Sequence, residues 1–589
     1  MCGIFGFVGH QPDAAKIVFE GLKRLEYRGY DSWGIAVSSS KDVSVFKKVG
    51  AIGTVEGVDL PDSNVAIGHT RWSTHGGVTE PNAHPHYSTD KSFVLAQNGI
   101  VENYTQLKSS LLKKGYKFQT ETDTEVIVRL IESRVKSSGN LQDAVRAAFL
   151  ELEGRNTIIL LTRGGEVIAA RNGSPLVVGL GDAGTYLSSD TLSFAPYVKS
   201  MIVIDNGQLV HCANEETAVF DIKTGKKIDY KTEKVDLENN RIDREGFPHF
   251  MLKEISEGPD VIRGLLSQDI SEYEVFAKAI LAAKNVYTLG SGTTGIAASQ
   301  IAFYLRKYPK VGATSMIGAE AMDYCDLFSR ADLVISPSQS GETADVLEVL
   351  EKAKKKGAKI ASYVNMPGST ATRMSDYKFM TQAGPEVCVM STKVFVSQIA
   401  WGYLISKITQ GRAKEGIKNL KSLAYKMAPY LNNGKNHATI RALAKKLIES
   451  KDIFLLGRGQ NLNIAMEGMV KIIEGTYKHA HAMPAGDLKH YAITLMEKGV
   501  PVIFAISQDE AKSDIMNAVN EVRARGATVI AVSPKPHESF DYHLPVPDTG
   551  ETSAIMNIIP LQLLAYYMTV ELGYNVDRPR NIAKSVTVK

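Results

Sequence analysis

A cysteine at the second position is the first residue in this sequence that could do covalent chemistry. Removal of Met1 would place the Cys2 thiol and a free α-amino group on one residue. That amine has a reference pKa of about 8, so near neutral pH part of it is unprotonated and acts as a base. An N-terminal amine is one known activator of a neighbouring nucleophile. A buried structural cysteine is the alternative, and position alone leaves both open.

A second group of chemically active residues is the hydroxyl-rich segment SQSGET, which follows an apolar run and precedes a helical pattern. The start of a helix offers unpaired N–H groups and the positive end of the helix dipole. The side chains of Ser338, Ser340 and Thr343 add donors, and Gly341 lets the backbone approach an anion closely. An ordinary helix cap needs only one hydroxyl, so the segment predicts a phosphate-ester site.

A glycine-rich turn, GSGTTG, lies upstream between a strand and a helix. It fits the GxGxxG pattern, but the acidic residue expected about 20 positions later in a dinucleotide site is missing, which argues against NAD. Thr293 and Thr294 of this turn are expected at the carboxyl edge of a parallel sheet, where ligands bind.

Two kinds of element must position these groups. The stretch from Cys2 to about Asp221 is rich in β-branched, alternating segments, which predict a mostly antiparallel α+β unit. Helical patterns interrupt it near residues 13–25 and 122–136. A polar, aperiodic stretch after Asp221 is interpreted as a linker.

The rest of the chain alternates apolar strands with amphipathic helices, which predicts parallel α/β domains. Residues 285–307 match residues 452–474 without a gap, and the following strands, 333–343 and 501–511, occur at similar distances. This repeat predicts two duplicated domains with a helical connection near 395–450.

The second copy of the hydroxyl-rich segment differs from the first. It reads SQDE, with Asp509 and Glu510 where an anion would lie. We therefore expect one phosphate ligand per chain.

Composition excludes several classes of protein. The 589 residues carry a net charge of +4, too little to indicate a nucleic-acid or membrane partner. The four cysteines form no CxxC pair, which argues against a disulfide framework and a structural zinc site. No signal peptide is recognised, and the longest apolar run, 558–573, is expected to be a buried helix. We expect a cytoplasmic protein.

Several motifs together resemble a known family. MCGIFG, LEYRGYDS, HTRWSTHG, NAHPH, QNGIVENY and ETDTEV resemble the glutamine-dependent amidotransferases with an N-terminal nucleophile. SQSGET, CVMSTKVF, EGMVKIIEGTY and RPRNIAKSVTVK resemble the sugar-isomerase half of one branch, the isomerising glutamine–fructose-6-phosphate aminotransferases. The resemblance spans essentially the whole chain.

The resemblance implies a fold and a set of domains. The fold is an N-terminal-nucleophile (Ntn) αββα glutaminase sandwich, followed by two duplicated αβα parallel-sheet sugar-isomerase (SIS) domains. The expected domains are a glutamine amidotransferase domain at 1–221, a linker at 222–250, a first SIS domain at 251–430, a second at 431–575, and a catalytic tail at 576–589.

In the front half, the resemblance implies that Cys2 attacks the side-chain amide of glutamine to give a thioester, glutamate and ammonia. Arg71 would bind the α-carboxylate as a planar fork, and Asp123 would hold the α-ammonium. Asn98 and the N–H of Gly99 would form the oxyanion hole. By the same resemblance Trp72 gates an ammonia channel, and the glutamine pocket is completed by Thr74 and His75.

In the back half, the resemblance implies that Lys584 forms a Schiff base with the ketone of fructose 6-phosphate. Glu474 would move a proton between C1 and C2 beside Lys471, and His490 would open the sugar ring. Without the resemblance, the same helix face is a salt-bridged surface stripe. The implied sugar-phosphate contacts are Thr293, Thr294, Ser338, Gln339, Ser340, Thr343, Val389 and Ala583. No cofactor or metal is expected.

Some positions depart from the family pattern. His481, Asp487 and Tyr491 replace Glu, Glu and Gly, Thr294 replaces a serine, and Trp33 stands where a small residue is usual. All but Trp33 surround the ketose site, so they bear on sugar specificity and rate rather than on the type of reaction.

The motifs fit several other functions less well. Asparagine synthetase-like enzymes need an SGGxDS loop, which is absent, and phosphoribosyl amidotransferases have no duplicated α/β unit. A non-enzymatic sugar-phosphate sensor would not need Cys2, Glu474 and Lys584 together. A relative that acts on another sugar phosphate, or that runs as a free-ammonia deaminase, stays open. The family implies a homodimer through the SIS domains, with small-molecule substrates and no nucleic-acid or membrane partner.

Overall fold

The computed structural model describes residues 2–39, 42–53, 55, 57–213, 216–235 and 243–587. The chain divides into two compact units. The first comprises Met1–Arg241 with Glu342–Ala344 and Ala583–Lys589, and the second comprises Ile242–Gly341 with Asp345–Ile582. Each unit is described by itself below.

The first unit is built on two antiparallel sheets, as the alternating segments predict. One has eight strands in the order β15-β11-β9-β10-β1-β4-β2-β3. Its strands are β1 Gly3–Gly9, β2 Ser32–Ser39, β3 Asp42–Val49, β4 Val65–Arg71, β9 Val177–Gly181, β10 Gly184–Ser188, β11 Ser200–Val203 and β15 Glu233–Lys234.

The other sheet has seven strands in the order β14-β13-β12-β8-β7-β6-β5. Its strands are β5 His86–Tyr87, β6 Phe93–Gly99, β7 Asn156–Thr162, β8 Val167–Asn172, β12 Gln208–Ala213, β13 Glu216–Asp221 and β14 Lys227–Ile228. An apolar layer that includes Ile4, Ile67, Val94 and Ile159 lies between the two sheets.

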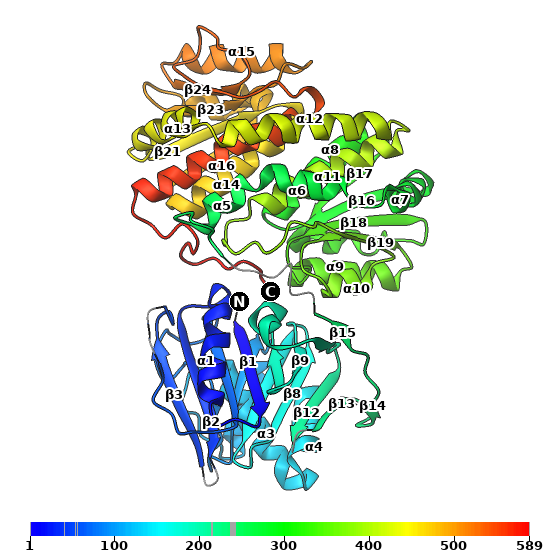
Figure 1. Cartoon of the computed structure of the whole chain (residues 1–589), viewed down its shortest axis with the longest axis vertical. Coiled ribbons are helices and arrows are strands. Elements are labelled where there is room, and N and C mark those ends of the chain that lie inside the picture. Colours follow the sequence, from blue (N-terminus) through cyan, green and yellow to red (C-terminus); the bar gives the residue numbers. More distant parts are fainter. Residues whose placement is uncertain are drawn as a thin grey trace. The chain divides into compact units, whose positions relative to one another are not determined.

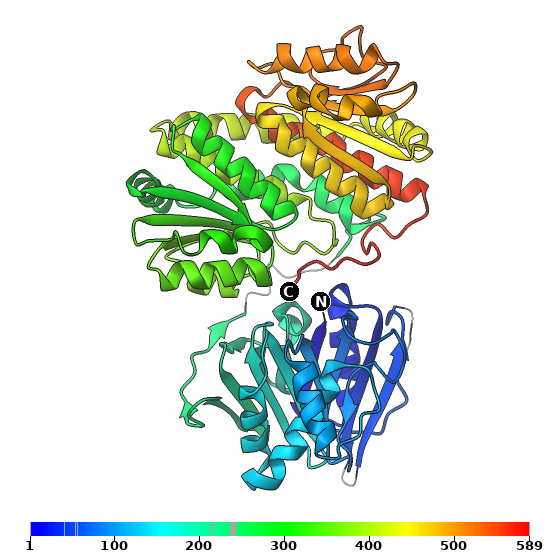
Figure 2. The ribbon, with the colours of Figure 1, turned by 180° about the vertical axis from the view of Figure 1, so that it is seen from behind.

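Helices cover the two outer faces. On one side α1 (Ala14–Leu25) packs against β1 and β4 through a cluster that includes Phe5 and Leu22. On the other side, Val126 and Val145 pack against the second sheet; they belong to α3 (Asp123–Ser138) and α4 (Leu141–Leu150), which α2 (Tyr104–Lys113) precedes. Figure 1 shows α1 over the sheet that contains β1, and the view in Figure 2 shows the helices on the opposite face. The αββα sandwich is therefore confirmed.

The helices expected near 13–25 and 122–136 are present as α1 and α3, whereas α2 and α4 were not expected. The stretch after Asp221 is not wholly a linker. Two short strands, β14 and β15, add to the edges of the two sheets, because backbone pairing at a sheet edge needs no apolar pattern in the added strand. Residues 236–242 of the expected linker and residues 588–589 of the expected tail lie outside the described residues.

The second unit contains two five-stranded parallel sheets with the same topology, β17-β16-β18-β19-β20 and β22-β21-β23-β24-β25. This identity confirms the duplication. The strands are β16 Asn285–Gly290, β17 Ala313–Ile317, β18 Asp332–Ser338, β19 Lys359–Val364 and β20 Tyr377–Met380, then β21 Asp452–Gly457, β22 His479–Pro484, β23 Pro501–Ala505, β24 Thr528–Ser533 and β25 Tyr542–Pro545.

Helices surround and connect these sheets. The expected helical connection consists of α11 (Lys393–Thr409), α12 (Ala413–Leu431) and α13 (Gly434–Leu447). The others are α5 Phe250–Ser256, α6 Gly258–Leu266, α7 Ile270–Ala282, α8 Thr293–Lys307, α9 Ala344–Lys355, α10 Thr370–Met374, α14 Leu462–Thr476, α15 Lys512–Arg523 and α16 Ser553–Glu571.

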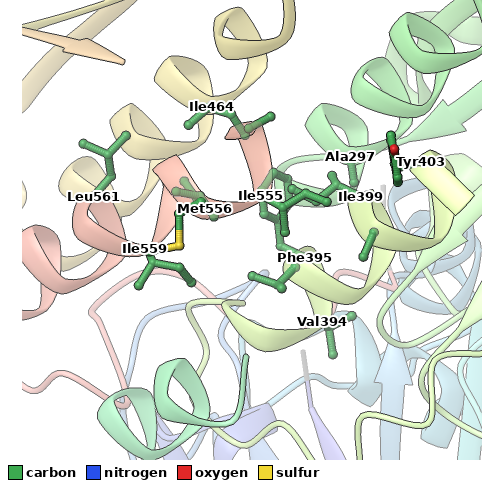
Figure 3. Packing of buried hydrophobic residues seen from close by; sticks show 14 of the residues in the cluster. Ala297, Val394, Phe395, Ile399, Tyr403, Ile464, Ile555, Met556, Ile559 and Leu561 are labelled. Atoms are coloured by element: carbon green, nitrogen blue, oxygen red, sulfur yellow. The ribbon is translucent and has the colours of Figure 1, made fainter. Parts of the chain in front are cut away.

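One continuous apolar core joins the two repeats of the second unit. Figure 3 shows side chains from α8, α11, α14 and α16 meeting there, among them Ala297, Phe395, Ile464 and Ile555. Because α14 packs against both α8 and α16, its position relative to the first repeat is fixed by this core.

A single helix among the described residues, Gly550–Glu571, is long and apolar enough to cross a membrane, and 89% of its apolar window is buried inside the protein. It includes α16, and its burial agrees with the expected buried helix at 558–573.

Candidate active sites

Cys2 lies directly before β1, and hydrogen bonds on both sides fix its position. Its sulfur accepts the N–H of Trp72 at 3.3 Å, and its carbonyl oxygen accepts Nε–H of Arg28 at 3.3 Å. Arg28 is held in turn by Asp190, whose Oδ2 lies 3.3 Å from Nη1 of Arg28. Both partners of this ion pair are buried. The thiol therefore starts from a rigid position.

The electrostatic environment of Cys2 keeps its proton in place. Burial raises the pKa of the thiol, while the charge of Arg71 lowers it and that of Asp123 raises it. The structure thus brings the predicted nucleophile within the fields of Arg71 and Asp123, the residues expected to bind the α-carboxylate and the α-ammonium of glutamine. A thiol with a raised pKa needs a base at the moment of attack, which is the role expected of the α-amino group.

Arg71 has a second role that the sequence did not indicate. Its guanidinium donates to the carbonyl oxygens of His75 at 2.5 Å, Gly76 at 3.2 Å and Gly77 at 3.1 Å. The side chain is almost fully buried. Arg71 therefore organises the loop that follows β4, besides being the cation expected to bind a carboxylate.

Asp123 is placed by the start of α3. Thr122 caps this helix by accepting the N–H of Glu125, so Asp123 occupies the first turn, where a carboxylate is favoured by the helix dipole. Its Oδ2 accepts the N–H of Val101 at 2.8 Å. Burial raises the pKa of Asp123, although this hydrogen bond opposes the shift. An arriving ammonium group would stabilise the charged carboxylate and lower this pKa.

Asn98 and Gly99 end β6 and carry the expected oxyanion donors. The Asn98 side chain is 1% exposed, and neither Nδ2 nor Oδ1 has a hydrogen-bond partner among the described residues. A buried amide without partners costs about 1–3 kcal/mol, so this one is available for a ligand. Gly99 has φ +134°, and a Cβ there would lie 2.2 Å from the carbonyl oxygen of Arg155, so only glycine fits.

The remaining predicted glutamine contacts lie around the loop after β4. The Trp72 ring meets Tyr30 edge-on at 5.8 Å, and the His75 ring meets Tyr104 at 4.9 Å. Thr74 is exposed. Trp33 lies away from this loop in the core, where its ring packs 5.4 Å from that of Phe46.

In the second unit, the hydroxyl-rich segment forms the predicted turn between β18 and α9. Ser338 ends the strand and its Oγ accepts the N–H of Gly341 at 2.8 Å. Gly341 has φ +64°, and a Cβ there would come within 2.2 Å of Ser369 Oγ. Gln339, Ser340 and Thr343 complete the segment, and α9 begins directly after it. This is the strand–turn–helix geometry expected for binding a phosphate.

The equivalent turn of the second repeat is filled by its own side chains. Asp509 Oδ2 accepts Nε2–H of Gln460 at 2.8 Å, and Ser507 Oγ accepts Nδ2–H of Asn461 at 2.7 Å. The side chains of this turn thus bond to neighbouring residues of the second repeat, and one phosphate ligand per chain stays a prediction.

A buried cluster of charges on α14 contacts Thr293, the first residue of α8. Lys471 Nζ is 3.4 Å from Glu467 Oε1 and 2.5 Å from Glu474 Oε2, and it donates to Thr293 Oγ1 at 3.1 Å. Lys471 and Glu467 are completely buried, whereas Glu474 is partly exposed. Burial disfavours the charged lysine, but its two carboxylate neighbours outweigh this and raise its pKa. The three residues form a buried site rather than a surface stripe.

Glu467 also belongs to this cluster. The sequence placed it on the same helix face as Lys471 but predicted no catalytic or binding role for it. Burial raises its pKa to about 7, against the opposing charge of Lys471. Oε1 accepts from Thr293 Oγ1 at 3.1 Å, while Oε2 has no partner among the described residues. Its position four residues before Lys471 could have indicated that the two side chains are in contact, because residues four apart are neighbours on a helix.

The other predicted sugar contacts lie in different settings. Thr294 uses its hydroxyl locally, donating to the carbonyl oxygen of Ser291 at 2.8 Å. Val389 is buried and donates its N–H to the carbonyl oxygen of Asp577 at 3.0 Å. His490 is exposed at the end of a short helix, Ala485–His490. Ala583 and Lys584 lie in the C-terminal segment that groups with the first unit.

Three of the residues that depart from the family pattern, His481, Asp487 and Tyr491, lie in the second repeat and are at least partly exposed. His481 packs against the Phe454 ring at 6.1 Å, and Tyr491 is 51% exposed. Asp487 lies on the short helix Ala485–His490. Among the residues that the structure describes, none form a group of three or more His, Cys, Asp or Glu side chains able to hold a metal ion.

Comparisons with known proteins agree with both halves. A glutamine amidotransferase domain model matches residues 48–219, and a SIS domain model matches residues 279–406 and 446–572. The chain is 35% identical over 600 residues to the glutamine–fructose-6-phosphate aminotransferase [isomerizing] of Pyrococcus horikoshii, with 100% of both chains covered. It is 37% identical over 602 residues to that of Aquifex aeolicus, again with 100% of both covered.

A solved structure supports the second unit. The C-terminal domain of glucosamine-fructose-6-phosphate aminotransferase from Francisella tularensis aligns with a TM-score of 0.52 at 29% identity, covering 57% of this chain and 100% of that chain. Full-length identity of this size, together with the matched domains, shows common ancestry over the whole sequence. The chain therefore belongs to the family of isomerising glutamine–fructose-6-phosphate aminotransferases.

Proposed function

We propose that the protein converts L-glutamine and D-fructose 6-phosphate to L-glutamate and D-glucosamine 6-phosphate, the first step of amino-sugar synthesis. The observation that carries the proposal is that one chain holds residues suited to two different chemistries. For the first, the Cys2 thiol is fixed within the fields of Arg71 and Asp123, in the unit that also carries the Asn98 amide without partners among the described residues. For the second, the Ser338–Gly341 turn belongs to the unit that holds the buried Lys471 cluster. The full-length relatives support the pairing.

In the first unit, the sulfur of Cys2 forms a bond to the side-chain amide carbon of glutamine, and its proton passes to the α-amino group. The oxygen of the tetrahedral intermediate becomes negative and is stabilised by Nδ2–H of Asn98 and the N–H of Gly99. The C–N bond breaks, the α-ammonium returns a proton to the leaving nitrogen, and ammonia departs. Water then hydrolyses the thioester to glutamate.

In the second unit, the phosphate of the sugar binds the turn at Ser338–Gly341, with donors from the start of α9. The amine of Lys584 adds to the C2 ketone and water leaves, which gives an imine. Ammonia then adds to the imine carbon and the Lys584 amine leaves, so that C2 carries an imine whose nitrogen comes from ammonia. Glu474 then takes a proton from C1 and returns it to C2, which converts the ketose skeleton to an aldose. Lys471 holds the Glu474 carboxylate in place at 2.5 Å, and His490 is assigned to ring opening.

We propose further that ammonia passes between the sites inside the protein, that the enzyme is a cytoplasmic homodimer formed through its SIS domains, and that it uses no metal or cofactor. We also propose the domain boundaries given by the sequence, 1–221, 251–430 and 431–575, with the linker at 222–250 and the catalytic tail at 576–589.

The deciding experiment measures glutamate release and glucosamine 6-phosphate formation by the purified protein. Cys2→Ala is tested with glutamine and separately with ammonium, and Cys212→Ala, a buried cysteine elsewhere in the first unit, is the matched control. We expect Cys2→Ala to lose the glutamine-dependent reaction and to keep any ammonia-driven synthesis, while Cys212→Ala keeps both.

Two other outcomes would revise the proposal. Release of glutamate without an amino sugar would leave the first site correct and the acceptor sugar wrong. Absence of both products in the wild-type protein would favour a sugar-phosphate sensor instead.

A further inference from the structure

Gln97, the residue before Asn98, has its backbone and its side chain held by hydrogen bonds. Its carbonyl oxygen accepts from Nε2 of His69 at 2.8 Å, and its N–H donates to Nδ1 of His84 at 3.4 Å. Its side-chain Oε1 accepts the Thr124 hydroxyl at 2.5 Å, and its Nε2 donates to Oδ1 of Asn156 at 2.6 Å. All five residues are at most 5% exposed.

The directions of these hydrogen bonds are fixed by chemistry. A carbonyl oxygen only accepts, so His69 carries its proton on Nε2. A backbone N–H only donates, so Nδ1 of His84 is unprotonated and the ring of neutral His84 has its proton on Nε2. That proton is donated to Thr124 Oγ1 at 3.0 Å, which leaves the threonine hydroxyl to donate to Gln97. These hydrogen bonds therefore have one consistent set of directions.

This arrangement requires neutral histidines, and their surroundings keep them neutral. The ring of His84 packs against those of His69, tilted by 33° at 4.2 Å between centroids, and His86, edge-on at 4.8 Å. Burial lowers the pKa of all three, of His69 to about 3. The charged side chains that act on the rings are cations, Arg71, Lys47 and, for His86, Arg129, which oppose protonation further.

We propose that His69, His84 and Thr124 are positioning residues that hold Gln97, and through it the Asn98 amide and the Gly99 N–H, in the geometry that binds the developing oxyanion. The inference rests on the proposed glutamine hydrolysis. The Asn98 side chain has no hydrogen-bond partner among the described residues, so its orientation depends on the strand that carries it. Without the clamp on Gln97, the last two residues of β6 would be held only by their backbone pairing to β7.

The clamp also connects two functional groups that lie on different elements. Thr124 follows Asp123 in the first turn of α3, while Gln97 precedes Asn98 at the end of β6. The hydroxyl bond between Thr124 and Gln97 therefore links the residue expected to bind the ammonium group with the residue expected to bind the oxyanion.

The test removes one link while keeping its shape. Thr124→Val deletes the hydroxyl, leaving Nε2–H of His84 and Oε1 of Gln97 without their partner, whereas Thr124→Ser restores it. Thr162→Val is the matched control, because its hydroxyl accepts the N–H of Glu166 at 2.9 Å at the far end of β7, outside the clamp. Each full-length variant is assayed for glutamine hydrolysis, for ammonia-driven glucosamine 6-phosphate formation, and for alkylation of Cys2 by iodoacetamide.

We expect Thr124→Val to lower kcat for glutamine hydrolysis by roughly 10- to 100-fold, because oxyanion donors act in the transition state. The KM for glutamine should change by less than about 3-fold, since ground-state binding uses other groups. Alkylation, which forms no oxyanion, and ammonia-driven synthesis should stay within about 2-fold of wild type. Thr124→Ser and Thr162→Val should resemble the wild-type enzyme.

Wild-type kcat in Thr124→Val would overturn the clamp while leaving the proposed function intact. An equal loss in Thr162→Val, or a parallel loss of ammonia-driven synthesis, would show general destabilisation and also overturn it. If Thr124→Val does not fold, Gln97→Met removes the same side-chain bonds and is held to the same criteria. A wild-type protein that never hydrolyses glutamine would instead refute the proposed function, and the clamp's assigned role with it.

Discussion

Replacing Gly99 with alanine is the sharpest test of the front site, because the structure shows how much room is missing. Gly99 has φ +134°, a backbone conformation that L side chains rarely adopt, and the new Cβ would lie 2.2 Å from the carbonyl oxygen of Arg155. That contact must open to at least 3.0 Å, and the atom in the way is backbone rather than a flexible side chain. The end of β6 must therefore move.

The size of the effect follows from that displacement. A shift of close to 1 Å takes the Gly99 N–H and the adjacent Asn98 amide out of hydrogen-bond range of an oxyanion, and misplacement on this scale costs about 100-fold in rate. Loss of one oxyanion donor costs about 100- to 1,000-fold, or about 3–4 kcal/mol of transition-state stabilisation. We therefore expect glutamine hydrolysis to fall at least about 100-fold in kcat.

The assay compares glutamate release with ammonia-driven glucosamine 6-phosphate formation in the same preparation. Gly139→Ala is the matched control: it also has positive φ, at +77°, but a Cβ there meets nothing within 4 Å. We expect the control to keep both activities and Gly99→Ala to lose only hydrolysis. Retention of hydrolysis within about 3-fold in folded Gly99→Ala would refute the assignment of this strand end to the oxyanion hole.

Three further outcomes test the rest of the molecule. Gly341→Ala, whose Cβ would lie 2.2 Å from Ser369 Oγ, should raise the KM for fructose 6-phosphate at least 10-fold without changing glutamate release in the absence of sugar; an unchanged KM would remove the phosphate from this turn. Lys471→Met leaves two carboxylates beside an uncharged side chain, so it should abolish amino-sugar synthesis and destabilise the second unit by about 3–5 kcal/mol in urea unfolding; stability equal to wild type would contradict the buried ion cluster. Because the folded pKa of His69 is about 3 and its unfolded value about 6.5, the unfolded chain binds the extra proton, and stability is lost as pH falls below 6.5. This residue alone should lower the free energy of unfolding by about 1.4 kcal/mol between pH 7.5 and 5.5, and His69→Gln should flatten the dependence of the urea midpoint on pH; an unaltered slope would mean that His69 does not titrate on unfolding.

Much of the architecture follows from local patterns. The alternating segments before residue 221 and the strand–helix alternation after it predict the two kinds of sheet, because periods of 2.0 and 3.6 residues encode which face is buried. The repeat between 285–307 and 452–474 is confirmed by two sheets with the same strand order. Short edge strands such as β14 were missed, since their pairing depends on a neighbouring backbone edge and not on their own side chains.

The sequence by itself determined the types of chemistry. A thiol at position 2, a hydroxyl-rich turn after a strand, and the spacing of Glu467, Lys471 and Glu474 on one helix face are all local features. The hydroxyl-rich turn predicts a phosphate cradle from its own residues. The roles of nucleophile and proton carrier came only with the family resemblance, because position 2 and the helix spacing each leave a structural alternative open.

Only the tertiary structure decided how those groups are held and which of them are buried. Arg28 meets Asp190 across 162 positions of the chain, and Thr124 meets Gln97 across 27. No local pattern encodes such pairs, because they form only when strands and helices from distant segments pack together. Burial has the same origin. Charged residues with this helical spacing can lie on an exposed surface or in a buried cluster, and it is the packing of α14 against its neighbours that excludes water from Lys471 and Glu467.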